Sequence, residues 1–264
     1  MTQDERLNFL IEAFKAEAKE YEKLCVPAER DGKRKFLRAL MNVRMPGPMS
    51  TEVLAVQDAY LRERAEEKGI IGLQDIPVIR NGLSVWQGDI TRLAVDAIVN
   101  SANSAMLGCF VPGHNCIDNC IQTYAGVQMR AECDRQMKLL KREYGQSYVQ
   151  PTAIPLLTDG YNLPAKKVVH IVGPVVTGPL TQKHRTELAA CYINTLDLCM
   201  REGLKSLAFC CISTGVFYFP NEEAAEIAVN TVRGWQETQG NVIERIIFNV
   251  FKDEDKKCYE NLIQ

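Results

Sequence analysis

The chain lacks the features that mark several large protein classes. Its formal net charge is only -2 over 264 residues, and neither a G-x-x-x-x-G-K-[ST] pattern nor a G-x-G-x-x-G pattern occurs in it. A near-neutral charge argues against a protein whose main partner is nucleic acid. The missing glycine patterns exclude a Walker-type phosphate loop and the dinucleotide fingerprint of a Rossmann fold.

Long hydrophobic runs and targeting signals are missing as well. The best candidate for a membrane segment, residues 168–180, is shorter than the ~20 residues that a membrane helix needs and is interrupted by glycine and proline. The N-terminus is acidic and lacks the basic start, the apolar run and the cleavage site of a signal peptide. We therefore expect a soluble, cytoplasmic protein without a membrane partner.

The hydrophobic pattern divides the chain into two parts. Residues 1–75 carry apolar residues at helical spacing, so we expect a helical N-terminal extension, with Ser50 as the N-cap of its third helix. From residue 76 to residue 264 short apolar strands alternate with helical patterns, which predicts an α/β sandwich with helices on both faces of its sheet. The expected strands are residues 83–86, 97–99, 153–156, 168–172, 207–212 and 246–250, and the expected helices are residues 117–143, 181–202, 221–239 and 254–263.

Two of the expected strands end in short polar turns. Asp89 follows the first strand in the sequence QGDIT, where it can accept a hydrogen bond from an exocyclic amine or a ribose hydroxyl, or simply cap the turn. Residues 100–103 read NSAN, which suits either the recognition of sugar hydroxyls or a polar turn with Asx hydrogen bonds. Because ligands of open α/β sheets bind at the carboxyl ends of strands, both turns are candidate ligand contacts.

A third loop, residues 213–220, joins an expected buried strand to a helix that begins near Pro220. Its sequence is STGVFYFP, and successive N–H groups in such a turn can form an anion-binding nest that Gly215 allows a ligand to approach closely. The motifs QGDIT, VNSAN and STGVFYFP occur in this order at strand ends. Over about residues 83–251 the chain thereby resembles the macrodomain family of ADP-ribose-binding proteins.

The resemblance implies a three-layer α/β/α fold around a mixed six-stranded sheet, with ADP-ribose lying across the strand ends. It implies that Asp89 binds the adenine amine with Ile90 beside it, and that Asn103 meets the distal ribose. The residues that it places around the diphosphate, largely through backbone amides, are Ser213, Thr214, Gly215, Val216 and Phe217.

Two of the ten cysteines and one of the three histidines lie in one short loop, which reads GCFVPGHNC. Cys109, His114 and Cys116 supply two thiolates and an imidazole, which are suitable ligands for Zn²⁺. Three protein ligands leave one coordination position open, as in a catalytic zinc site. Cys120 follows Cys116 by one helical turn and would close the site as a fourth ligand, which would make the zinc structural. Free or redox-active thiols are a further alternative.

This loop stands where hydrolytic macrodomains usually carry a glycine-rich loop, and it resembles the zinc-dependent macrodomains, a bacterial branch that also has an N-terminal helical extension. Asp118 corresponds to the acidic residue of the family pattern, so Asp118 and Asn103 are the expected catalytic residues. The alternative for Asp118 is a first-turn carboxylate that complements the helix dipole. His170, in an apolar strand pattern, and His184, in a polar stretch, are given no role.

The sequence therefore predicts a zinc-dependent hydrolase that releases mono-ADP-ribose from a modified protein, with one Zn²⁺ per chain beside the distal ribose. A zinc ion there would act as a Lewis acid or lower the pKa of a bound water toward ~7. Two alternatives stay open: a module that binds ADP-ribose without turnover, and an interaction protein whose zinc serves only folding. The resemblance also suggests a setting beside a sirtuin-type ADP-ribosyltransferase and a lipoyl-carrier protein.

Overall fold

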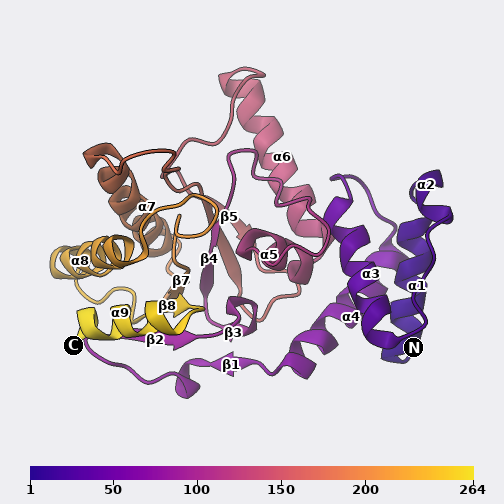
Figure 1. Ribbon diagram of the computed structural model, residues 1–264, viewed down its shortest axis with the longest axis horizontal. Helices are drawn as coiled ribbons and strands as arrows, with labels where there is room; N and C mark the ends of the chain where they lie inside the picture. The colour runs from indigo at the N-terminus through magenta and orange to yellow at the C-terminus, as the bar shows by residue number, and fades with distance from the viewer.

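The computed structural model describes residues 1–264 and consists of an N-terminal helical part and an α/β part (Figure 1). The helical part packs α1 against α3 and α4, and it has a hydrophobic core of its own that also includes Val127 of the α/β part. The Ser50 side chain accepts a hydrogen bond from the Val53 N–H and caps α4, as predicted. The helices are α1 (Gln3–Lys15), α2 (Lys19–Glu22), α3 (Arg30–Val43) and α4 (Thr51–Lys68).

The expectation of helices up to residue 75 is wrong. The last helix ends at Lys68, because Gly69 follows it with φ +81, a conformation that only glycine adopts easily. The chain then forms strand β1 (Ile71–Gly72), which pairs in parallel with β3 (Leu93–Ala94), and a 3-10 turn, η1 (Leu73–Asp75). The link between the two parts is therefore a short strand pairing rather than a continued helix.

The main sheet has six strands in the order β2-β8-β7-β4-β6-β5. Neighbouring strands are parallel except for β5, which runs antiparallel to β6, so the predicted mixed sheet is confirmed. The parallel strands all end at the same edge, which brings their loops together. The strands are β2 (Leu83–Gln87), β4 (Ala97–Ser101), β5 (Leu156–Asp159), β6 (Lys167–Ile171), β7 (Ser206–Phe209) and β8 (Arg245–Val250).

Two strands differ from the prediction by three residues at an end, and the others by at most two. The strand expected over residues 153–156 starts only at its last residue, because Ala153 adopts φ +64 and Pro155 has no N–H to donate to a neighbouring strand. The strand expected over residues 207–212 ends at Phe209, and the buried residues that follow begin a loop. Because residues beyond the end of this strand are also buried, the length of the apolar run overestimates the length of the strand.

Helices cover both faces of the sheet, which confirms the predicted α/β/α sandwich. Figure 1 shows α5 (Ile117–Ala125) and α6 (Val127–Tyr144) between the sheet and the N-terminal helices, and the other three helices on the opposite side. The single helix predicted over residues 117–143 is in fact two, because Gly126 breaks it with φ +99. The opposite layer consists of α7 (Gln182–Arg201), α8 (Asn221–Gln239) and α9 (Asp253–Ile263). None of the helices is long and apolar enough to cross a membrane.

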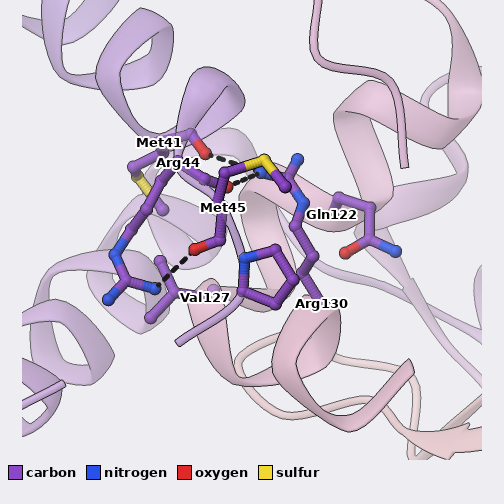
Figure 2. A pocket seen from close by; sticks show the side chains of 8 residues that line it. Met41, Arg44, Met45, Gln122, Val127 and Arg130 are labelled. Carbon is purple, nitrogen blue, oxygen red and sulfur yellow. Dashed lines mark hydrogen bonds between the residues drawn. The ribbon is translucent and has the colours of Figure 1, made fainter. Parts of the chain in front are cut away.

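Arg130 of α6 joins the two parts of the molecule (Figure 2). Its Nη1 atom lies 3.2 Å from the carbonyl oxygen of Met41, 3.0 Å from that of Asn42 and 2.5 Å from that of Arg44, at the C-terminal end of α3. The guanidinium also lies 4.4 Å from the centre of the Phe110 ring. A cation at this position satisfies carbonyl groups that the helix leaves unpaired and complements the negative end of its dipole.

Replacing Arg130 with methionine is expected to lower the free energy of unfolding by ~2–4 kcal/mol, because hydrogen bonds to a charged group are lost and carbonyl oxygens stay buried without a donor. Denaturant unfolding measures the change. Arg135→Met is the matched control, since Arg135 lies on the same helix, is 60% exposed and pairs only with Glu132. An Arg130→Met protein as stable as the control protein would contradict this assignment.

Candidate functional site

The candidate residues lie along one edge of the sheet, where the parallel strands end. Strands β2, β8, β7 and β4 are neighbours in this order. They are followed by Asp89, by Phe251, by residues 213–217 and by Asn103, respectively. The four segments therefore lie side by side along this edge in an order that differs from their order in the chain. An elongated ligand along the edge would contact them one after another.

Asp89 is the N-cap of the 3-10 turn η2 (Ile90–Arg92) that follows β2. Its Oδ1 atom accepts hydrogen bonds from the Thr91 N–H at 3.0 Å and from the Thr91 hydroxyl at 2.6 Å, while Oδ2 lies 2.6 Å from Lys68 Nζ. Burial raises the pKa of Asp89, but the charge of Lys68 and these hydrogen bonds more than offset it, so the pKa lies below its ordinary value. Asp89 is a fixed carboxylate, and Ile90 beside it is buried in the core.

Phe251 was not predicted from the sequence, although it belongs to the same end of the site. It follows β8 directly and is 79% exposed, and its carbonyl oxygen accepts a hydrogen bond from Gln87 Nε2 at 3.1 Å. The Asn249 amide donates to the Gly88 carbonyl at 3.0 Å and fixes the turn before Asp89. Phe251 and Asp89 follow neighbouring strands, so an exposed aromatic ring here could stack on a flat heterocycle while the carboxylate accepts a hydrogen bond from it.

The loop after β7 presents free backbone donors. The N–H groups of Gly215, Val216 and Phe217 donate to no protein acceptor. Ser213 adopts φ +65, and its Oγ atom is buried without a hydrogen-bond partner. The Thr214 hydroxyl donates to a carbonyl oxygen of its own loop at 3.0 Å and stabilises the turn. Three successive free N–H groups in a turn where Gly215 and Val216 are exposed form a site that suits an anionic group.

Gly215 is not required by the packing of the protein itself. A Cβ atom added there would meet no other atom within 4 Å. A side chain at this position would therefore extend into the open space beside the free N–H groups, where a bound anion would lie.

Asn103 and Asp118, the two expected catalytic residues, are in direct contact. Asp118 lies in the first turn of α5 and is only 6% exposed. Its Oδ2 atom accepts a hydrogen bond from Asn103 Nδ2 at 3.2 Å, and its Oδ1 atom accepts one from Asn100 Nδ2 at 2.8 Å. Burial raises the pKa of Asp118 to about 6, despite the hydrogen bond from Asn100 and the charge of Arg130.

His170, which the sequence analysis left without a role, lies directly behind this pair. It is fully buried, with Nδ1 3.0 Å from Asn100 Nδ2 and Nε2 2.9 Å from Thr158 Oγ1. Burial lowers the pKa of His170 to about 4, so the ring is neutral, accepts from Asn100 at Nδ1 and donates to Thr158 at Nε2. The orientation of Asp118 is thus set by a buried chain of hydrogen bonds that crosses three strands, β4, β6 and β5.

The structure brings the three predicted metal ligands together. The Cys109 and Cys116 sulfur atoms and a ring nitrogen of His114 all lie within 4.8 Å of one another, and Cys109 Sγ is 3.4 Å from His114 Nδ1. Cys120 is not part of this group, and its sulfur lies 3.5 Å from Arg38 Nη2 instead. The arrangement is therefore a set of three ligands, as an open zinc site requires.

The chemistry of these ligands fits a divalent cation. Cys116 caps the start of α5, and its sulfur accepts a hydrogen bond from the Asn119 N–H at 3.4 Å. Burial nevertheless raises the pKa of Cys116 to about 12, with a further contribution from Cys109. A thiol of this kind is deprotonated readily only when a cation binds beside it, and Zn²⁺ coordinates two thiolates and an imidazole well.

The N-terminal helices hold residues 108–116, the metal-ligand loop, in place. The sequence did not predict this contact. Arg38 of α3 donates to the His114 carbonyl at 2.6 Å and to the Asn115 side chain at 3.3 Å. The Asn42 side chain of the same helix accepts from the Gly113 N–H at 2.9 Å. The extension is therefore part of the site and does more than cover the core.

An α/β/α sandwich with polar loops at the ends of β2, β7 and β4 is the architecture of the macrodomains. The Macro domain model matches residues 99–228, and the chain belongs to the macrodomain family. It is 48% identical to the protein-ADP-ribose hydrolase of Treponema medium over 267 aligned positions, a match that covers all of both chains. It is 42% identical to the protein-ADP-ribose hydrolase of Staphylococcus aureus strain MRSA252, over 97% of this chain and 94% of the relative.

Solved structures agree with this assignment. The macrodomain of Trypanosoma brucei in complex with ADP-ribose superposes with a TM-score of 0.65 and 26% identity, over 86% of this chain and 95% of the other. The Oceanobacillus iheyensis macrodomain with ADP superposes with a TM-score of 0.61 and 30% identity, over 71% of this chain and 93% of the other.

Proposed function

We propose that this macrodomain is a protein-ADP-ribose hydrolase that removes mono-ADP-ribose from modified side chains and uses one Zn²⁺ ion held by Cys109, His114 and Cys116. The observation that carries the proposal is the position of the metal-ligand loop. Asn103 Nδ2 donates both to the carbonyl oxygen of Gly108, at the start of this loop, and to Asp118. The names of the full-length relatives support the hydrolase activity.

ADP-ribose would lie along the sheet edge in the order of the strands. Its adenine would stack on Phe251 and donate its amine to Asp89, next to Ile90. Its diphosphate would lie on the loop at residues 213–217 and accept from the free N–H groups of Gly215, Val216 and Phe217. The distal ribose would then reach Asn103. Each chemical group of the ligand meets a protein group of complementary character, and this match supports the assignment of the individual residues.

The chemical step would use Asp118 as the proton acceptor. A pKa of about 6, raised by burial, keeps Asp118 mostly ionised near neutral pH and still basic enough to take a proton from an attacking water. Asn100 and Asn103 hold the two carboxylate oxygens in fixed positions. When bound, zinc would polarise a ribose or ester oxygen and make a neighbouring water more acidic. Asn103 would orient the distal ribose against the carboxylate.

The substrate that we propose is a mono-ADP-ribosylated protein. A lipoyl-carrier protein modified by a sirtuin-type transferase, which the family resemblance suggested, is the first one to try. The cytoplasm suits this role, because the two cysteine ligands must stay reduced to bind zinc and the cytoplasm keeps thiols reduced.

The direct test is to incubate the full chain with a mono-ADP-ribosylated protein and to quantify free ADP-ribose by mass spectrometry. The proposal expects many molecules released per molecule of enzyme. Binding of ADP-ribose without its release would instead assign the protein to the non-catalytic binding modules.

Replacing Asp89 with alanine is expected to weaken ADP-ribose binding by ~1–3 kcal/mol, because the adenine amine would be buried without an acceptor. Isothermal calorimetry measures this directly. Asp159→Ala is the control, since Asp159 is an exposed carboxylate that pairs with Lys167 away from the ligand loops. Equal affinities of the Asp89→Ala and control proteins would remove Asp89 from the adenine site.

A further inference from the structure

Lys68, the last residue of α4, reaches from the N-terminal extension into the adenine end of the site. Its Nζ atom lies 2.6 Å from Asp89 Oδ2, donates to the Thr91 hydroxyl at 3.1 Å, and lies 3.6 Å from the centre of the Tyr124 ring. Only 20% of its side chain is exposed. A partly buried ammonium group between a carboxylate, a hydroxyl and an aromatic face is fixed in both position and charge.

The backbone around Lys68 is fixed as well. Arg92 Nε, from the turn that Asp89 caps, donates to the carbonyl oxygen of Gly69 at 2.7 Å. Strand β1 then pairs with β3 immediately beyond this turn. The end of α4 and the turn at Asp89 are therefore tied together on both sides of the Lys68 side chain.

The numbers of hydrogen-bond donors on Lys68 and of acceptor positions on Asp89 determine what remains available to a purine ligand. An ammonium group has three N–H donors, and here they face a carboxylate, a hydroxyl and a ring, so none remains for a ligand. A carboxylate has about four acceptor positions. Two at Oδ1 are taken by Thr91 and one at Oδ2 is taken by Lys68, so one acceptor position remains at Oδ2.

We propose that Lys68 is a positioning residue that directs the remaining acceptor of Asp89 toward the ligand and so makes the site specific for a purine with an exocyclic amine. This rests on the proposed function, in which adenine lies at Asp89. A purine that carries a carbonyl group at the same ring position would place an acceptor against the carboxylate, and the occupied Lys68 would offer it no donor. The N-terminal extension thereby contributes a determinant of ligand specificity.

The test compares two ligands, ADP-ribose and its hypoxanthine analogue, in which a carbonyl replaces the amine, by calorimetry on the full chain. The wild-type protein is expected to bind ADP-ribose more tightly. Lys68→Met is expected to lower the affinity for ADP-ribose about tenfold, because the loss of one well-oriented hydrogen bond has about this effect. The affinity for the analogue is expected to change less than twofold. Lys68→Arg is expected to restore most of the preference, because it keeps the charge beside Asp89.

Lys166→Met is the matched control, since Lys166 pairs with Asp96 at 2.7 Å near the start of β6, at the opposite edge of the sheet. Lys68→Gln serves as a second variant should Lys68→Met fold poorly, and thermal unfolding checks both. Tighter binding of ADP-ribose by the variants would mean that Lys68 competes with adenine and would overturn the proposal. Equal losses for both ligands, or no loss, would overturn it too. A wild-type protein that binds neither ligand would instead contradict the proposed function.

Discussion

Replacing Asp118 with alanine is expected to slow the release of ADP-ribose by ~10²–10⁴-fold, the usual contribution of a positioned general base. The zinc content is expected to stay at one ion per chain, because Asp118 is not one of the three gathered ligands. Single-turnover kinetics and elemental analysis on the same preparation measure both quantities. The affinity for ADP-ribose is expected to change little, since it arises mainly at Asp89 and residues 213–217.

Asp134→Ala is the control for this experiment. Asp134 lies on α6 and pairs only with Lys138. Circular dichroism must show that Asp118→Ala is folded, because the substitution removes one of the two acceptors of each of the Asn100 and Asn103 amides. A folded, zinc-loaded Asp118→Ala protein with wild-type turnover would exclude Asp118 as the base and leave it as a first-turn carboxylate that stabilises α5.

The second large effect is expected at Gly215, where glutamate should abolish ADP-ribose binding. The added side chain starts in open space, because its Cβ atom would meet no other atom within 4 Å, and the protein should therefore fold normally. It would nevertheless occupy the space beside the free N–H groups and place a negative charge next to a diphosphate. Calorimetry should therefore detect no binding, and turnover should be lost with it.

Gly234→Glu provides the matched control, because Gly234 lies in α8 and a Cβ atom added there also meets no other atom within 4 Å. It should bind ADP-ribose like the wild-type protein. Wild-type affinity in a folded Gly215→Glu protein would show that the diphosphate does not lie on this loop.

The sequence predicted the parts of the site that depend on local order along the chain. Asp89, Asn103 and the loop at residues 213–217 each follow a strand, and parallel strands end at a common edge, so their approximate meeting place could be inferred. The cluster of Cys109, His114 and Cys116 was visible because its members lie within one short loop.

Contacts between distant segments could not be inferred in this way. The pairing of Lys68 with Asp89, and that of Arg38 with the metal-ligand loop, depend on how the N-terminal helices dock on the α/β part. A charged residue on an amphipathic helix has no pattern that distinguishes a solvent-facing position from one that reaches a neighbouring loop. The extension was therefore predicted only as a helical part of the chain, without a contribution to the site.

His170 was overlooked for a different reason. It lies within an apolar strand, where a histidine with satisfied hydrogen bonds is a common structural residue. The parallel register of β4 and β6 places Asn100 opposite His170 and so links it to Asp118, and register between strands that are distant in sequence is not apparent from either strand alone.

Turnover by protein from which the metal has been removed tests the central claim most directly. Chelation is expected to stop the release of ADP-ribose from a modified protein while most of the affinity for free ADP-ribose and the folded structure remain, and added Zn²⁺ is expected to restore the activity. Cys120→Ser should behave like the wild-type protein, because its sulfur lies outside the group formed by Cys109, His114 and Cys116. Full turnover by protein verified as zinc-free would contradict a catalytic zinc, and unfolding on chelation would assign the metal a structural role.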